Sequence, residues 1–172
     1  MRPIAFILLA LITACSSALE KKTIFVDAAI SQNRVSQQWL NALENRQSKP
    51  YLDSLALLSR PMTSTEKSWL QLMQSTAVHW NTLRDSLNVP FEGITLKDTI
   101  YVLAGYMGED DGFTYQDQTV CFDLTAFQQN YDSAILPENG DRIDRIFAHE
   151  YTHLLHKSWA KKKNLVLKNF KD

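Results

Sequence analysis

The sequence is poor in cysteine and carries no excess of positive charge. Only two cysteines occur among 172 residues, so a framework of several disulfides is excluded. Lys and Arg number 18 against 19 Asp and Glu, and this balance does not predict the basic face that binds nucleic acid. The chain also lacks internal repeats, low-complexity tracts and a hydrophobic run long enough to cross a bilayer as a helix. A nucleic-acid partner is therefore not expected.

The N-terminus has the layout of a secretory signal. Arg2 precedes an apolar run over 4–12, which is shorter than the ~20 residues of a spanning helix, and small residues follow. The junction Ile12-Thr13-Ala14-Cys15 resembles the bacterial lipobox, where cleavage precedes a cysteine whose thiol is acylated. The resemblance implies a lipoprotein signal peptide over 1–14, lipidation at Cys15 and a tether over 15–22. An ordinary signal peptide and a buried N-terminal strand are the alternatives.

A lipidated cysteine predicts a place in the cell. The protein would be held to a membrane of the bacterial cell envelope by its lipid anchor. Because Ser16 and not aspartate follows Cys15, the resemblance implies the outer membrane, facing the periplasm, in a Gram-negative cell.

Cleavage before Cys15 leaves 172 − 14 = 158 residues with a net charge of −2. This length suits one domain, which we place at 23–172. Cys121 then has no disulfide partner. It lies in the apolar run "TVCFDL", where packing as a small hydrophobe is favoured over a catalytic thiol.

In the first half of the chain, the residue pattern predicts an extended stretch over 23–30 followed by helices. Helices are predicted over 35–47, 51–58 and 64–88, and Thr63 with Glu66 has the spacing of a capping box. One broad apolar face of the long helix is expected in the core and comprises Trp69, Leu72, Met73, Ala77, Trp80 and Leu87. His79 is expected to be structural or exposed.

The second half predicts a small sheet and a final helix. Strands are expected over 98–106 and 118–124, an acidic turn over 107–113, a short helix over 125–131 and a helix over 141–163 capped by Asn139 or Asp141. The acidic turn lacks the ligand spacing of a calcium loop. The fold class is thus α+β, with N-terminal helices, a small mixed sheet and the final helix beneath it.

The final helix contains "IFAHEYTHLLH", which holds three of the four histidines. At ~100° per residue, Ile143, Phe147 and Leu154 form a buried stripe. His149, His153 and His156 fall on a neighbouring face, and Glu150 lies between the two. The spacing of four places two imidazoles one turn apart, so that both reach one metal ion while Glu150 approaches its water. A polar helix face without a metal is the alternative.

This stretch resembles the active-site helix of zincin metallopeptidases, closest to the gluzincin-like group of predicted bacterial zinc-dependent proteases. The resemblance covers about 98–163, an upper zincin subdomain. It implies one zinc ion held by His149 and His153, Glu150 as the general base, and a peptide or protein substrate. The strand "QTVCFDL" is the candidate to hold the substrate by strand addition at a sheet edge.

The sequence departs from the zincin pattern at the third ligand. The metzincin pattern is excluded, because His156 stands at its glycine position and Trp159 at the position of its last histidine. A gluzincin takes its third ligand from a later glutamate, but no glutamate follows Glu150 in this sequence. Two residues remain as candidates for the third ligand: His156, on the same helix, and Asp172, the last residue. The simplest explanation for the missing glutamate is that the chain is truncated and lacks the helix that would carry this ligand. The alternatives to a peptidase are therefore an inactive or truncated peptidase-fold lipoprotein acting as a binding or envelope module, and a metal-binding lipoprotein without catalysis.

Replacing Cys15 by Ala tests the lipid anchor. Because acylation requires the thiol, the C15A protein is expected in the soluble fraction of lysed cells, and the wild type in the membrane fraction. Membrane retention of C15A would show that the lipobox interpretation is wrong.

Overall fold

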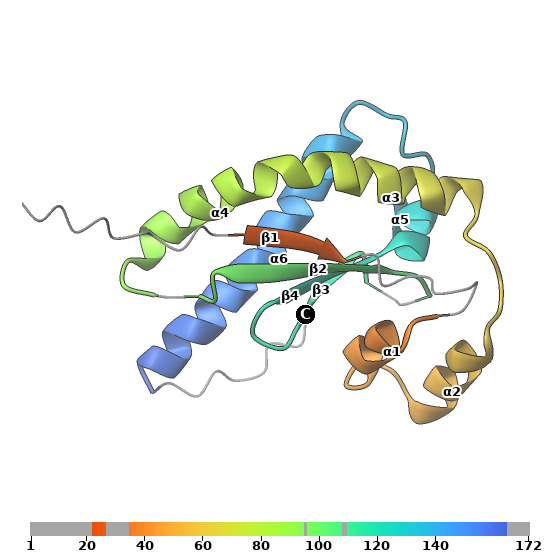
Figure 1. Ribbon diagram of the computed structural model, residues 1–172, viewed down its shortest axis with the longest axis horizontal. Helices are drawn as coiled ribbons and strands as arrows, with labels where there is room; N and C mark the ends of the chain where they lie inside the picture. Colours follow the sequence, from red (N-terminus) through yellow and green to blue (C-terminus); the bar gives the residue numbers. More distant parts are fainter. Residues whose placement is uncertain (1–21, 27–34, 95, 108–109, 165–172) are drawn as a thin grey trace, which may run out of the picture.

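The computed structural model describes residues 22–26, 35–94, 96–107 and 110–164, which form an α+β fold (Figure 1). Cys15, the signal sequence and Asp172 lie outside these residues. The expected fold class is confirmed, including a small sheet of mixed direction. Within the described ranges, no helix combines the length and the apolar character that crossing a membrane requires.

Four strands form the sheet in the order β1-β2-β4-β3: β1 (Lys22–Val26), β2 (Thr99–Gly105), β3 (Gly112–Tyr115) and β4 (Thr119–Asp123). The first three in this order are parallel, and β3 runs antiparallel to β4. Every residue of β4 is buried, as expected for a strand with neighbours on both sides and cover on both faces. The tether expected over 15–22 overlaps the sheet by one residue, Lys22.

Helices cover the two faces of the sheet. On one face lie α3 (Ser64–Thr76), α4 (Trp80–Asn88), α5 (Leu124–Tyr131) and α6 (Asn139–Lys162); on the other lie α1 (Gln37–Leu43) and α2 (Lys49–Leu57), as Figure 1 shows. Phe122 stacks on Trp80 of α4, with ring centroids 5.8 Å apart. Phe113, which points to the opposite face of the sheet, meets Trp39 of α1 at 5.5 Å.

The long helix expected over 64–88 is interrupted. A turn of 3₁₀ helix, Ala77–His79, separates α3 from α4. Three residues at 120° instead of 100° rotate Trp80 by about 60° relative to an unbroken helix. Trp69 can thereby pack against Phe127 of α5 while Trp80 packs against Phe147 of α6. Tertiary packing on two partners overrides the uniform helical pattern.

Two boundaries also differ from expectation. The acidic turn is shorter than 107–113, because β3 begins at Gly112. The final helix is capped by Glu138, without a side-chain hydrogen bond, and not by Asn139 or Asp141. The Asn139 amide is engaged elsewhere, since it donates to the Ser133 carbonyl at 2.7 Å and so pins the loop before α6. The predicted capping box of Thr63 and Glu66 is confirmed.

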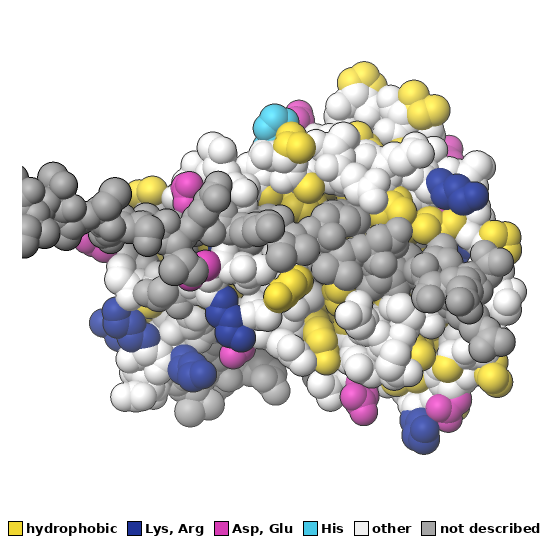
Figure 2. All heavy atoms as spheres, in the orientation of Figure 1, with side chains coloured by type: hydrophobic (Ala, Val, Ile, Leu, Met, Phe, Trp, Pro, Cys, Tyr) yellow, Lys and Arg dark blue, Asp and Glu magenta, His cyan; other side chains and the backbone are white. Residues whose placement is uncertain are grey.

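Charged side chains on the face drawn in Figure 2 are scattered in ones and twos of both signs. Hydrophobic side chains lie between them over the helices. Exposed large hydrophobic residues include Val78 before α4 and Ile135 in the loop before α6.

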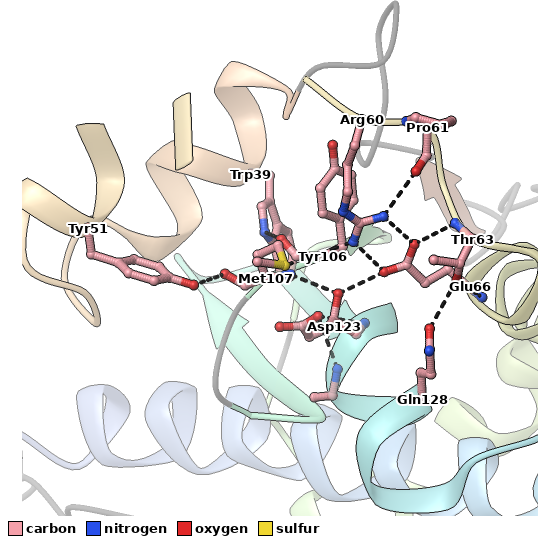
Figure 3. Close-up of polar contacts among 12 residues, drawn as sticks. Trp39, Tyr51, Arg60, Pro61, Thr63, Glu66, Tyr106, Met107, Asp123 and Gln128 are labelled. Atoms are coloured by element: carbon pink, nitrogen blue, oxygen red, sulfur yellow. Dashed lines mark hydrogen bonds and ion pairs between the residues drawn. The ribbon is translucent and has the colours of Figure 1, made fainter. Parts of the chain in front are cut away.

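A buried carboxylate joins the segment after α2 to α3 and α5 (Figure 3). Glu66 of α3 is 1% exposed and receives a bidentate pair from Arg60, at 2.8 and 2.6 Å. It also accepts from the Thr63 N–H and the Thr125 hydroxyl, both at 2.9 Å. Burial alone would raise the pKa of Glu66, but these hydrogen bonds and the Arg60 charge outweigh it and lower the pKa.

The Glu66→Gln variant is expected to lose about 2 kcal/mol of stability at pH 7, because Arg60 keeps its charge without a carboxylate partner. A lowered folded-state pKa contributes stability that is present at neutral pH and lost as the pH falls through that pKa, so the difference from wild type should narrow below pH ~4. Urea unfolding between pH 7 and 3.5 measures both effects.

Asp53→Asn is the matched control, since it removes an acid from the exposed pair of Lys49 and Asp53, 3.1 Å apart. A surface pair of this kind is worth less than about 1 kcal/mol. Equal losses in the two variants would contradict a special role for the buried pair.

Candidate metal centre

Helix α6 turns its polar face to the surface because its apolar face packs in the core. Phe147 stacks on Trp80 of α4 with ring centroids 4.4 Å apart and planes inclined by 4°. Phe147, Tyr151 and Leu154 are at most 1% exposed. The buried stripe predicted from the 3.6-residue period is confirmed, and it includes Tyr151 as well. Residues on the opposite side of the helix must therefore face outward.

His149 and His153 lie together on this outward side. Their Nε2 atoms are 3.0 Å apart, with ring centroids at 4.6 Å and planes at 90°. Two nitrogens that each lie 2.0–2.1 Å from one tetrahedral ion would be roughly 3.3 Å apart. The observed separation is close to that value. The two histidines thus converge as the spacing of four predicts.

Glu150 completes the group at the border between surface and core. Its side chain is 9% exposed, and one of its oxygens lies 4.0 Å from His149 Nε2. The candidate ligand atoms of His149, Glu150 and His153 all fall within 4.8 Å of one another, so this group could hold a metal ion. No other such group of His, Cys, Asp or Glu occurs in the part of the chain that the structure describes.

Strand β3 passes directly over the stem of Glu150. A Cβ atom at Gly112 would lie 2.7 Å from Ile146 Cγ2 and 3.3 Å from Glu150 Cγ. Only glycine allows the strand to approach the helix this closely. Lys157 of α6 donates to the Thr114 hydroxyl at 2.6 Å and holds the strand further along.

The edge strand beside this group is β3 and not the predicted "QTVCFDL". That stretch forms β4, which pairs with β2 on one side and β3 on the other, so it offers no open edge. The prediction was wrong because the acidic turn was expected to be loop throughout. Its last residues form β3, which occupies the edge.

His156 lies one turn beyond the group. Its ring meets Phe91 edge-on, with centroids 5.1 Å apart, and it is not part of the His149–Glu150–His153 cluster. It does line the same pocket of about 380 Å³, together with Leu87, Arg145, Ala148, His149, Thr152 and His153. Asp172, the other candidate third ligand, lies outside the described residues. The third ligand therefore stays a prediction.

The remaining residues considered from the sequence, Cys121, the acidic turn and His79, lie outside the metal group. Cys121 is fully buried, and burial, with a smaller contribution from the Glu150 charge, raises the pKa of its thiol far above the usual range. This confirms packing as a small hydrophobe. In the acidic turn, Asp110 pairs with Arg46, and Asp111 accepts hydrogen bonds from Asn130 and Tyr131. His79 is exposed.

Two contributors to the site were missed from the sequence. Gly112 brings β3 onto the metal helix, and an isolated glycine at a strand end is a signal of close backbone approach. Arg145, one turn before His149, lines the pocket. No local pattern distinguishes it from other exposed arginines.

The variants His149→Ala and His153→Ala are each expected to lower zinc affinity more than about 100-fold, because each removes a ligand from a site of few ligands. Metal content after dialysis against a zinc buffer measures the loss. His79→Ala, an exposed histidine outside the cluster, should retain zinc. A similar loss in His156→Ala would identify His156 as the third ligand, whereas full retention in His149→Ala would exclude the site.

Comparisons of the chain with protein-family models, with curated proteins and with solved structures give no match. The similarity to zincin peptidases is therefore carried by the residues of the motif itself. Membership of that family stays a prediction.

Proposed function

We propose that this protein is a zinc-dependent peptidase tethered to the bacterial cell envelope through a lipid on Cys15. The observation that carries the proposal is the convergence of His149 and His153, with Nε2 atoms 3.0 Å apart, beside a nearly buried Glu150. An exposed polar face would place histidines at this spacing, but it would not require a carboxylate beneath them at the edge of the sheet.

The donor set suits zinc. Imidazole nitrogens at this separation match a tetrahedral ion of the size of Zn²⁺, and a site with an open position is the catalytic kind. A bound zinc ion would supply Lewis-acid activation of a water and polarisation of a substrate carbonyl.

Glu150 acts as the general base in this proposal. Its carboxylate lies within 4.0 Å of a ligand nitrogen, which suits contact with a water at the metal without a direct bond to the ion. The carboxylate takes the proton of the attacking water and passes it to the amine that leaves. Because β3 lies against the stem of Glu150 at Gly112, the carboxylate has little freedom to swing away.

Among the described residues, β3 pairs with a strand on one side only, and its other edge supports binding of an extended peptide. A strand added there would run along α6, past Glu150 at Gly112 and toward Lys157 at Thr114. The substrate's main chain would thereby pass over the metal-binding histidines. Main-chain pairing gives affinity without side-chain selectivity.

Glu150→Gln is expected to keep zinc and to lower peptide hydrolysis at least about 100-fold, because the amide cannot accept the proton. Quenched-fluorescence peptides measure turnover, and metal analysis confirms that the site is loaded. The control is Glu44→Gln, an exposed position at the end of α1.

Zinc binding and peptide hydrolysis together distinguish the candidate functions. Zinc binding without Glu150-dependent turnover would support a metal-binding lipoprotein. Failure to bind zinc at micromolar concentration would support a tethered binding or envelope module of peptidase-like fold.

A further inference from the structure

A groove between α4 and α6 leads to the histidine pair. The pocket at His149 and His153 shares two of its lining residues, Arg145 and Ala148, with an adjoining hollow of about 420 Å³ that reaches His79. The two hollows thus form one groove on the side of the metal group opposite β3. It begins near the start of α4 and ends at the histidines.

The lining of this groove suits a peptide side chain or chain end. Its apolar residues are Leu83 and Leu87 of α4 and Ala148 of α6, and hydroxyl groups come from Thr82, Ser86 and Thr152. A mixed surface of this kind holds an organic ligand by apolar contact and orients it with few polar groups.

One cation lies where the two hollows meet. Arg145 is exposed and forms no hydrogen bond or ion pair with any residue in the described ranges. Its neighbour Arg142, in contrast, lies over the Tyr131 ring at 4.0 Å and donates to Asn139. Arg142 is therefore engaged in packing, whereas Arg145 is available to a ligand.

The one acidic residue lining the groove is turned to the core side. Asp144 accepts a hydrogen bond from Trp80 Nε1 at 2.9 Å. Burial raises the pKa of Asp144, although the Trp80 hydrogen bond and the charge of His79 oppose the shift. Asp144 is thus engaged with Trp80, whereas the Arg145 guanidinium is available at the middle of the groove, and a divalent ion at the histidines would add positive charge beside it.

We propose that Arg145 is a specificity-determining residue that binds a carboxylate of the peptide substrate, from an acidic side chain or from the chain's C-terminus. This inference rests on the proposed peptidase function. A guanidinium binds a carboxylate through two parallel hydrogen bonds, which suits the planar fork of arginine.

The helical geometry sets the position of this carboxylate. Arg145 precedes His149 by four residues, about 6 Å along the helix axis. An extended peptide advances about 3.3 Å per residue. The preferred acid therefore lies about two residues from the scissile bond.

Cleavage profiling of a peptide library by mass spectrometry tests the proposal. Wild type should prefer an acidic residue at one position near the cleaved bond by about 5- to 10-fold over the amide. Arg145→Gln should lose this preference, and Arg145→Glu should shift it to lysine. Lys161→Gln, an exposed cation later on α6, should retain it. Unchanged preference in Arg145→Gln would overturn the proposal.

Paired synthetic peptides separate the two sources of carboxylate. In the first pair, both peptides have an amidated C-terminus, and one carries Glu where the other carries Gln. In the second pair, the sequences are identical, and the C-terminus is free in one peptide and amidated in the other. Selectivity in the first pair assigns a side-chain subsite, and selectivity in the second assigns recognition of the chain end. If neither pair shows selectivity, the proposal is overturned.

Binding separates this inference from the proposed catalysis. The zinc-loaded Glu150→Gln protein is titrated with the same peptides by calorimetry, with and without Arg145→Gln. Carboxylate-dependent binding that Arg145→Gln removes supports the subsite even if wild type hydrolyses nothing, an outcome that would reject only the peptidase proposal. Zinc-loaded protein that binds acidic and amide peptides equally overturns the inference while leaving hydrolysis intact.

Discussion

The stacking of Phe147 on Trp80 sets the rotation of α6, and the candidate site depends on that rotation. The planes are nearly parallel, and Trp80 also donates to Asp144 one turn earlier on the same helix. With these contacts made, His149 and His153 must point outward and Glu150 must lie at the border of the core. A rotation of one residue, about 100°, would bury an imidazole and expose an aromatic ring.

Two unlike walls flank the outward face of α6. On one side β3 offers backbone hydrogen-bonding groups at a sheet edge and meets the helix at Gly112. On the other side α4 supplies leucines and hydroxyl groups, and α6 adds Arg145. A substrate held between them would gain affinity from the strand and selectivity from the groove. The histidine pair lies between the two sources.

The N-terminal helices complete the second face of the sheet. Trp39 of α1 packs on Gly105, where a Cβ would collide with its ring, and its indole donates to the Tyr106 carbonyl at 2.9 Å. The Arg60–Glu66 pair then joins the segment after α2 to α3 and α5. These helices thus stabilise the strands that support the site, although none of their residues belongs to the metal group.

The sequence by itself determined the features that depend on local periodicity and spacing. The buried stripe of α6, the convergence of His149 and His153, the Thr63–Glu66 cap and the α+β class all follow from residues within a few turns of one another. Only the tertiary structure decided that β3 occupies the sheet edge, that the helix after Thr63 breaks at Ala77–His79 and that Arg145 borders the metal pocket. These features depend on contacts between segments distant in sequence, and local patterns carry no information about which distant surface a side chain meets.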